Sequence, residues 1–436
     1  MYMRTLMRSL AAMIVGLLTM SCNEQPRACG LGKTCPPQTH CIDGLCQNLP
    51  WWSDVAEDDA LGVDCSMPDN TTSPAGRSAL GGGWVNEGFE IFGGNPELGG
   101  VCDKPGSSSW TAHRWRPCKG WQAHAGPVPL PRESAASTGG FDSVWMFGGR
   151  RRDKAGGPWS LYGDLWRLSG SPARWTLTST ADAPLRHGAA IAAQVEPPSV
   201  WVFGGDAAIN DQPSIYLQDI RRYRLDQNQW ELPPTTGSFP SARSGHGLVA
   251  LQSGKTLIMF GGKAANGLTA DTWQFDTKKM SWKRLDLSGP SARHGFSMAQ
   301  SQGTVWLFGG RDDSEQKLRN DLWRFTSTAG WERIRVGDLG AQATVGGVLE
   351  PQSNPCIPTD KWVQIDADSP ARRSHALISA HAEGLWLFGG RGSCGPLADL
   401  WRLDLSSFIW ELRGPADQSY PCPRRASLCQ AWCTPP

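Results

Sequence analysis

The sequence contains six copies of the motif Phe-Gly-Gly, and each copy ends a short hydrophobic run that is typical of a β-strand. The phenylalanines are Phe92, Phe147, Phe203, Phe260, Phe308 and Phe388. Successive copies are separated by 55, 56, 57, 48 and 80 residues. A recurring period of about 50 residues indicates a repeat protein, in which each repeat forms one unit that stacks on its neighbours. This spacing constrains the fold more than any other feature of the chain.

Further positions recur around each copy of the motif. An arginine lies 15 or 17 residues before each phenylalanine and opens another apolar run: Arg77, Arg132, Arg186, Arg243, Arg293 and Arg373. After the glycines comes a strand that begins at Asp164, Asp219, Asp271, Asp321 or Asp399. In four copies a tryptophan follows nine residues after the third position of that strand. Each repeat therefore predicts four short strands joined by turns, and nothing after the N-terminal leader shows helical periodicity.

The double glycine and the two spaced aromatic positions resemble the Kelch repeat, over roughly residues 73 to 413. The resemblance implies an all-β fold, a six-bladed β-propeller with one four-stranded blade per repeat. Physical reasoning agrees, because one blade alone leaves both of its faces exposed, whereas radial stacking buries tryptophans and phenylalanines between blades. The glycine pair supplies a strand end where backbones approach closely or adopt positive φ.

The interval of 80 residues before Phe388 is the one irregularity of the repeat. We interpret residues 332–361 as an insertion beside the fourth strand of the fifth blade, for which Trp331 and Trp362 both fit the spacing. A degenerate seventh blade that includes Val345-Gly346-Gly347 is the alternative. Ring closure is open at this point: residues 425–428 resemble residues 77–80 and could add a terminal strand, or disulfides in the tail could close the ring.

The N-terminus has the pattern of an export signal over residues 1–21. Arg4 and Arg8 precede an apolar run that is too short for a comfortable membrane span. The following Ser21-Cys22 resembles a bacterial lipoprotein signal, which implies lipidation of Cys22, although Thr19 stands where that family prefers leucine. Ordinary cleavage and secretion is the alternative. We therefore expect an exported protein of the cell envelope, lipid-anchored in the outer membrane or periplasm.

The thirteen cysteines fit an oxidising compartment, because lipidation of Cys22 leaves an even number for disulfides. Four of them lie in a predicted stalk module at residues 22–50: Cys29, Cys35, Cys41 and Cys46. For these four, two disulfides are favoured over a zinc site with His40. A polar, acidic linker follows at residues 51–72. Residues 414–436 form a disulfide-rich tail. Cys65 and Cys102 are expected on one face of the first blade, where they could pair.

In the Kelch architecture the six repeat arginines would surround a central funnel. They could bind a carboxylate or a phosphate there, or they could be structural, each paired with an aspartate of a neighbouring blade. The arginines that follow the glycine pairs vary more between repeats and are better ligand candidates: Arg150, Arg151, Arg311 and Arg391. The net charge of +1 gives no indication of a nucleic-acid partner, and none is expected.

No catalytic or metal-binding pattern emerges, so we predict neither a cofactor nor a metal. The histidines near the repeat arginines, His187, His246, His294 and His375, have differing offsets and share no acidic partner. Two enzymes have related architectures, galactose oxidase and bacterial N-acetylneuraminate epimerase. The five tyrosines assemble no copper set of the first kind, and no motif matches the second. The glycine pairs end strands and do not open helices, which argues against a phosphate loop or a nucleophile elbow.

The loops after the glycine pairs differ most between repeats, which is where binding specificity usually resides. Trp159, Tyr162 and Tyr216 lie in two of these loops and would suit a protein or glycan partner. We therefore predict a non-catalytic binding scaffold at the cell envelope that binds its ligand through propeller-face loops. The alternatives are a carbohydrate-active enzyme whose arginine funnel holds an anionic substrate, and a purely structural envelope protein. The sequence indicates no oligomeric state.

Overall fold

The computed structural model describes residues 39–42, 45–48, 74–86, 88–95, 112–116, 120–124, 126–152, 158–180, 183–209, 212–251, 254–312, 318–334, 369–381, 384–392 and 395–413. These residues form β-strands and contain no α-helix, as the repeat predicted. The chain divides into two compact units, Met1–Ser66 and Met67–Pro436. In the first unit the described part is an antiparallel hairpin of β1 (Thr39–Ile42) and β2 (Leu45–Asn48), with Cys41 opposite Cys46.

The described residues of the second unit form six principal sheets, numbered here in chain order. Sheet 1 has β3 (Gly81–Val85), β4 (Gly88–Phe92), β5 (His113–Arg116) and β6 (Gly120–Ala123). Sheet 2 has β7 (Ala136–Gly139), β8 (Ser143–Phe147), β11 (Leu165–Ser169) and β12 (Arg174–Ser179). Sheet 3 has β13 (Ala190–Gln194), β14 (Ser199–Phe203), β15 (Ile220–Arg224) and β16 (Gln229–Glu231).

Sheet 4 has β19 (Gly247–Leu251), β20 (Thr256–Phe260), β23 (Thr272–Asp276) and β24 (Ser281–Leu285), with β17 (Thr236–Gly237) parallel to its outer strand. Sheet 5 has β25 (Ser297–Ser301), β26 (Thr304–Phe308), β27 (Leu322–Thr326) and β28 (Gly330–Ile334). Sheet 6 has β29 (Leu377–His381), β30 (Gly384–Phe388), β33 (Leu400–Asp404) and β34 (Trp410–Leu412). Short pairs also form in the loops: β9 (Arg150–Arg152) with β10 (Trp159–Leu161), β18 (Arg243–Ser244) with β21 (Lys263–Ala264) and β22 (Gly267–Leu268), and β31 (Arg391–Gly392) with β32 (Gly395–Pro396).

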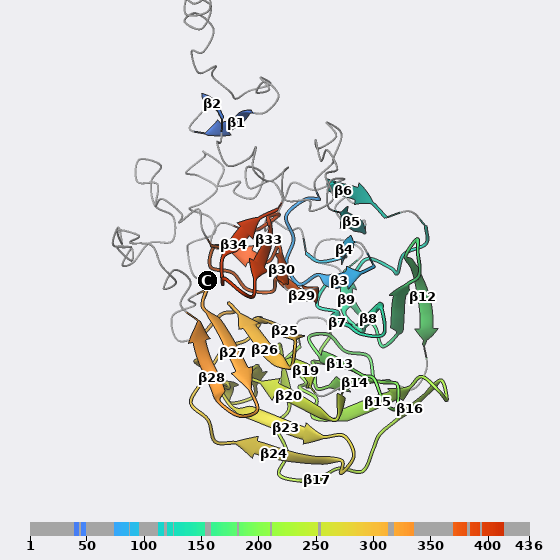
Figure 1. The fold of residues 1–436 in the computed structure, drawn as a ribbon. Coiled ribbons are helices and arrows are strands. Elements are labelled where there is room, and N and C mark those ends of the chain that lie inside the picture. The colour runs from blue at the N-terminus through green and yellow to red at the C-terminus, as the bar shows by residue number, and fades with distance from the viewer. Residues whose placement is uncertain are drawn as a thin grey trace, which may run out of the picture. The chain divides into compact units, whose positions relative to one another are not determined.

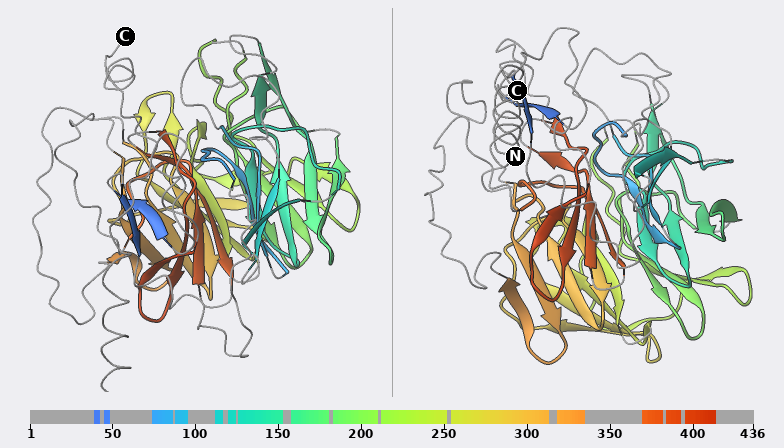
Figure 2. Two further views of the ribbon diagram at one scale, coloured as in Figure 1. Left: turned by 90° about the horizontal axis from the view of Figure 1, so that it is seen from above. Right: turned by 45° about the horizontal axis from the view of Figure 1, so that its top comes forward.

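The first strands of the six sheets form a closed circle (Figures 1 and 2). Each contacts the next, in the order β3, β7, β13, β19, β25, β29 and back to β3. Residues from these strands and from the turns just before them, among them His246 and Phe296, line an axial cavity of about 140 Å³. The described residues therefore form a β-propeller ring, and no strand is exchanged between sheets 1 and 6.

Apolar clusters fill the junctions between successive sheets, and the Phe-Gly-Gly phenylalanine is the recurring contact. In each junction the phenylalanine of one sheet packs on the outer-strand tryptophan of the next, with ring centroids 5.0 to 5.5 Å apart. The pairs are Phe92–Trp175, Phe147–Trp230, Phe203–Trp282, Phe260–Trp331, Phe308–Trp410 and Phe388–Trp121. Burial of large aromatic side chains contributes much of the stability of a protein core. The repeat spacing therefore places the residues that hold neighbouring sheets together.

A belt of main-chain hydrogen bonds closes around the axis. Its six members are Ala79, Ser134, Gly188, Gly245, Gly295 and His375, and each N–H donates to the carbonyl of the preceding member at 2.5 to 3.0 Å. All six have φ between 55° and 64°, a conformation that glycine adopts at no steric cost. The N–H of Ala79 donates to His375, which joins sheet 1 to sheet 6 as the other sheets are joined.

Several sequence predictions fall outside the described residues: the leader with Cys22, most of the stalk, the linker at residues 51–72, and the tail at residues 414–436. Most of the interpreted insertion does too, but its start is corrected. Trp331 lies in β28, which continues to Ile334 because Ile334 packs in the apolar cluster between sheets 5 and 6. The part of the chain that the structure describes offers no long apolar helix of the kind that spans a membrane.

Candidate functional site

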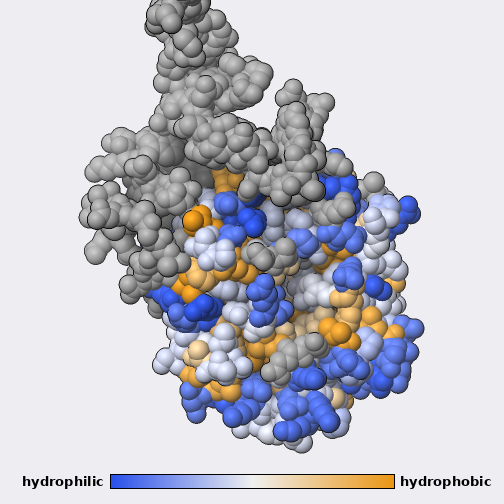
Figure 3. All heavy atoms as spheres, in the orientation of Figure 1, coloured by the Kyte–Doolittle hydropathy of each residue, from blue (hydrophilic) through white to orange (hydrophobic). Residues whose placement is uncertain are grey.

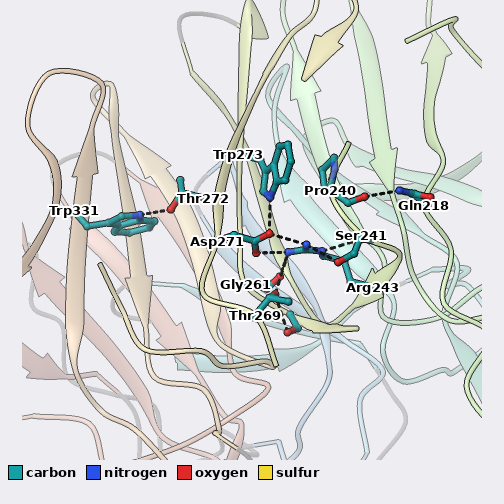
Figure 4. A network of polar contacts seen from close by, with 11 residues as sticks. Gln218, Pro240, Ser241, Arg243, Gly261, Thr269, Asp271, Thr272, Trp273 and Trp331 are labelled. Atoms are coloured by element: carbon teal, nitrogen blue, oxygen red, sulfur yellow. Dashed lines mark hydrogen bonds and ion pairs between the residues drawn. The ribbon is translucent and has the colours of Figure 1, made fainter. Parts of the chain in front are cut away.

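The six repeat arginines are fully buried within the sheets. Arg373 is typical: Nη1 and Nη2 donate to the two carboxylate oxygens of Asp399 at 2.6 and 2.7 Å, and Nη1 also donates to the Gly389 carbonyl at 2.9 Å. Sheet 4 repeats the arrangement with Arg243 and Asp271 (Figure 4). Five of the six arginines form such a bidentate pair, and Arg77 donates instead to the main-chain carbonyls of Ala75 and Gly93. We therefore describe the six arginines as structural clamps.

The pairing differs from the sequence interpretation in one respect. Each aspartate belongs to the same sheet as its arginine and not to a neighbouring one, as Arg132–Asp164 and Arg293–Asp321 show. The reason is local: the arginine precedes the first strand and the aspartate precedes the third, and both ends meet beside the glycine pair. Burial alone would raise the pKa of Asp271 and Asp321, but the hydrogen bonds and the charge of the clamp arginines lower it below its ordinary value.

The glycine pair of each sheet docks on the main chain of the next sheet's arginine. At the junction of sheets 6 and 1, the Gly390 N–H donates to the Arg77 carbonyl at 2.9 Å. A Cβ on Gly389 would lie 2.7 Å from that same oxygen, and Gly389 has φ +65°. The first glycine therefore leaves room for the Arg77 carbonyl, and the second supplies the N–H that donates to it. The same pattern recurs at the other five junctions, which explains why the motif needs two glycines.

The residue after each glycine pair lies beside the belt, at what we call the mouth of the axial funnel. It pairs through its main chain with the residue that follows a clamp arginine. The mouth residues are Asn95, Arg150, Asp206, Lys263, Arg311 and Arg391. Because the belt is narrow, side chains from non-adjacent sheets can act on a common neighbour here.

Three of the predicted ligand residues converge on one belt residue. Burial, followed by His294, Arg311, Arg391 and Arg150, lowers the pKa of His375 to about 4. The rings of His294 and His375 meet edge to face with centroids 5.7 Å apart. Arg311 pairs through its main chain with His294, and Arg391 pairs with Ser374, the residue before His375, so both arginines lie at positions beside this histidine. The charge of Arg150 also acts on His375, which is neutral near pH 7.

The three arginines are not equally available. Arg150 donates from Nε to Glu133 at 2.8 Å, and its guanidinium lies over the Trp159 ring, 4.1 Å from the centroid. Arg311 and Arg391, in contrast, have no carboxylate partner among the described residues, and the buried Nε of Arg311 has no hydrogen-bond acceptor there. Two half-buried arginines without a carboxylate partner, at the mouth positions of the adjacent sheets 5 and 6, are suited to binding an anionic group.

The aromatic candidates are more constrained than the sequence suggested. Trp159 is sandwiched between Arg150 and Arg152, with both guanidinium groups about 4 Å from its ring. The buried Arg132 lies 3.8 Å from the Tyr162 ring centroid. Both rings therefore support the structure of sheet 2, and Arg151 lies in the same hairpin, opposite Ser160.

Tyr216 lies in the loop of sheet 3 and is half-buried. Asp206 orders this loop, because its Oδ1 accepts from the N–H groups of Ala208 and Ile215, both at 2.9 Å. Sequence reasoning did not find this role of Asp206, although its signal was available: an acidic residue stands where three other repeats carry arginine. Figure 3 shows hydrophilic residues along the rim of the face seen in Figure 1 and apolar patches further in.

Within the described ranges, no three His, Cys, Asp or Glu side chains come together as a group that could hold a metal ion.

His246 is buried between sheets 3 and 4, where its ring packs edge to face on Phe203 with centroids 5.3 Å apart. Neither ring nitrogen has a well-formed hydrogen bond to a described residue. Burial and then Arg243 lower its pKa to about 3, against the contrary effects of the Phe203 carbonyl and Asp271. At the same position in sheet 5, Phe296 packs on Phe260 at 5.5 Å.

We expect His246→Phe to raise the free energy of unfolding by about 1–2 kcal/mol at pH 7, because it removes an unsatisfied buried polar group. The unfolded state binds a proton on His246 below about pH 6.5, whereas the folded state does not until about pH 3. The free energy of unfolding of the wild type should therefore fall by about 3 kcal/mol through this residue between pH 7 and pH 4. Urea unfolding at several pH values checks this; an equal acid loss in the variant would contradict it.

Comparisons with known proteins agree with this geometry. The chain matches the family model described as the KLHDC2/KLHL20/DRC7 Kelch-repeats domain, over residues 65–251 and 190–344. It is 31% identical over 215 residues to Kelch domain-containing protein 3 of Bos taurus, which is 48% of this chain and 50% of that protein. It is also 26% identical over 206 residues to Host cell factor 1 of Homo sapiens, covering 44% of this chain and 9% of that protein. The chain thus spans about half the length of the first relative and less of the second.

Proposed function

The chain belongs to the Kelch-repeat family, and from this premise we propose that it is a non-catalytic scaffold that binds a protein partner at the mouth of its axial funnel. The observation that carries the proposal is the pair Arg311 and Arg391, which lack a carboxylate partner among the described residues. The clamps use their guanidinium groups for the fold, so the mouth is where charge is left for a ligand. Variable loops on a repeated scaffold are the usual place for binding specificity.

We also propose that the ring holds six blades, one for each principal sheet. The support is that the Gly310 N–H of sheet 5 donates directly to the Arg373 carbonyl of sheet 6. A further blade between those sheets would have to separate these groups. The proposed place of action is the cell envelope, with a lipid anchor at Cys22; its support is the leader sequence.

The partner's contribution at this site is an anionic group, a carboxylate or a phosphate. Arg311 and Arg391 offer planar donors that match either group. Arg150 contributes charge, but its Nε–H is engaged with Glu133. Tyr216 lies in a neighbouring loop and would add a contact at the rim.

The double variant Arg311→Ala/Arg391→Ala is expected to weaken partner binding at least about tenfold, because each charged hydrogen bond contributes about 1.5–3 kcal/mol. The matched control is Arg324→Ala: this arginine pairs with Glu332 on the exposed outer strands of sheet 5, and binding should be unchanged. Surface plasmon resonance with a partner captured on the wild type measures the effect. Equal affinity of the double variant and the wild type would exclude the mouth as the binding site.

A further inference from the structure

We infer that binding of an anion between Arg311 and Arg391 is coupled to uptake of one proton by His375, so that the anion binds more tightly as the pH falls. The inference rests on the proposed function, since it concerns the regulation of the same site. It adds a property that neither arginine has by itself, because arginine does not titrate in the physiological range.

The ring of His375 is held in a defined place. Its main chain is part of the belt, donating to Gly295 and accepting from Ala79. A Cβ on Gly295 would lie 2.5 Å from Cε1 of this ring, so the ring lies directly on that glycine. The edge-to-face contact with His294 fixes it from the side of sheet 5.

The groups that act on His375 come from several elements. Sheet 5 contributes His294 and Arg311, sheet 6 contributes Arg391, and sheet 2 contributes Arg150. The carboxylate of Glu133 is bound to Arg150. On sheet 3, Asp206 acts on His187 and orders its own loop.

An anion would reverse the balance of charge around this ring. Without one, burial and the neighbouring cations hold the pKa of His375 at about 4. An opposite charge within about 4–6 Å raises the pKa of an imidazole by about 1–3 units. The pKa in the bound state would then be about 6, so the bound state holds more protons than the free state through the mildly acidic range.

The sign of the effect follows by linkage. Between the free and bound pKa values, each proton taken up on binding makes the affinity rise as pH falls, by at most tenfold per pH unit. Above about pH 7 both states are deprotonated at His375 and the affinity levels off. With a bound pKa of about 6, the affinity at pH 5 is expected to be about tenfold that at pH 7.5.

Isothermal titration calorimetry with sulfate as the probe tests this, because the charge of sulfate is constant over this range. The wild type should bind sulfate about tenfold more tightly at pH 5 than at pH 7.5. Titrations in two buffers of different ionisation enthalpy should show net proton uptake at pH 5.5. In His375→Ala the affinity should be nearly independent of pH. Alanine is tolerated at this belt position, as Ala79 shows, and His246→Phe is the matched control that should keep the pH dependence.

The outcomes separate the inference from the proposed function. If sulfate binding is lost in Arg311→Ala/Arg391→Ala but is equal at both pH values in the wild type, the anion site stands and the coupling is wrong. The coupling is also wrong if His375→Ala retains the pH dependence. If the wild type binds no sulfate, or the double arginine variant binds it as well as the wild type, the anion site itself is overturned and the coupling with it. An NMR titration of the His375 ring with and without sulfate gives the pKa change directly.

Discussion

Replacing Asp399 by alanine is expected to lower the free energy of unfolding by about 3–5 kcal/mol. Asp399 and Arg373 are both at most 1% exposed, so the variant leaves a buried guanidinium without its counter-charge. The Nε1–H of Trp401, which donates to Asp399 at 2.7 Å, also loses its acceptor. Urea unfolding followed by tryptophan fluorescence measures the change.

The control for this variant is Asp226→Asn, which weakens an ion pair with Arg224 on the surface. An exposed, solvent-screened pair of that kind contributes little to the free energy of unfolding. If Asp399→Ala costs no more than this control, the clamps do not stabilise the sheets as described.

Replacing Gly389 by alanine is expected to lower the free energy of unfolding by about 3 kcal/mol or more. Part of the cost is positive φ, about 1–2 kcal/mol for a residue with a Cβ. The rest arises because the new Cβ would lie 2.7 Å from the Arg77 carbonyl, so sheets 6 and 1 must move apart.

Gly303 provides the matched control for that variant. It also has positive φ, +78°, but a Cβ there would meet nothing within 4 Å. Gly303→Ala should therefore lower the free energy of unfolding only by the backbone strain, about 1–2 kcal/mol. Equal losses in the two variants would mean that the junction contact contributes nothing.

Much of this fold was predictable from the sequence because the residues of one contact between sheets recur in each repeat. The Phe-Gly-Gly motif and the outer tryptophan recur at each junction, as in Phe203–Trp282, so the pattern predicted a stacked all-β architecture. The partner of each clamp arginine was assigned to the wrong sheet, because spacing alone does not say on which sheet an aspartate meets an arginine. The arginine precedes the first strand of a sheet and the aspartate precedes the third strand of the same sheet, and these two strand ends lie together in the folded sheet.

The belt and the mouth were less predictable. Belt positions hold Gly, Ala, Ser and His, so they share a backbone conformation and no residue type. The surroundings of His375 combine loops of sheets 2, 5 and 6 that are far apart in the sequence. Arg150 and Arg311 occupy equivalent positions, yet only Arg150 meets Glu133, because the residue after the preceding clamp arginine is acidic in that repeat alone.

The closed ring positions the loops around one axis, and the six belt amides test it most directly. Native-state hydrogen exchange should be measured at Ala79, Ser134, Gly188, Gly245, Gly295 and His375, in the wild type and in Gly389→Ala. In the wild type all six should exchange only through global unfolding, with the same free energy. In the variant, the exchange rate of the Ala79 amide should increase more than that of the other five, since its N–H spans the junction of sheets 6 and 1. Fast exchange of Ala79 in the wild type, with the other five protected, would show that the ring is open at that junction and would contradict the account.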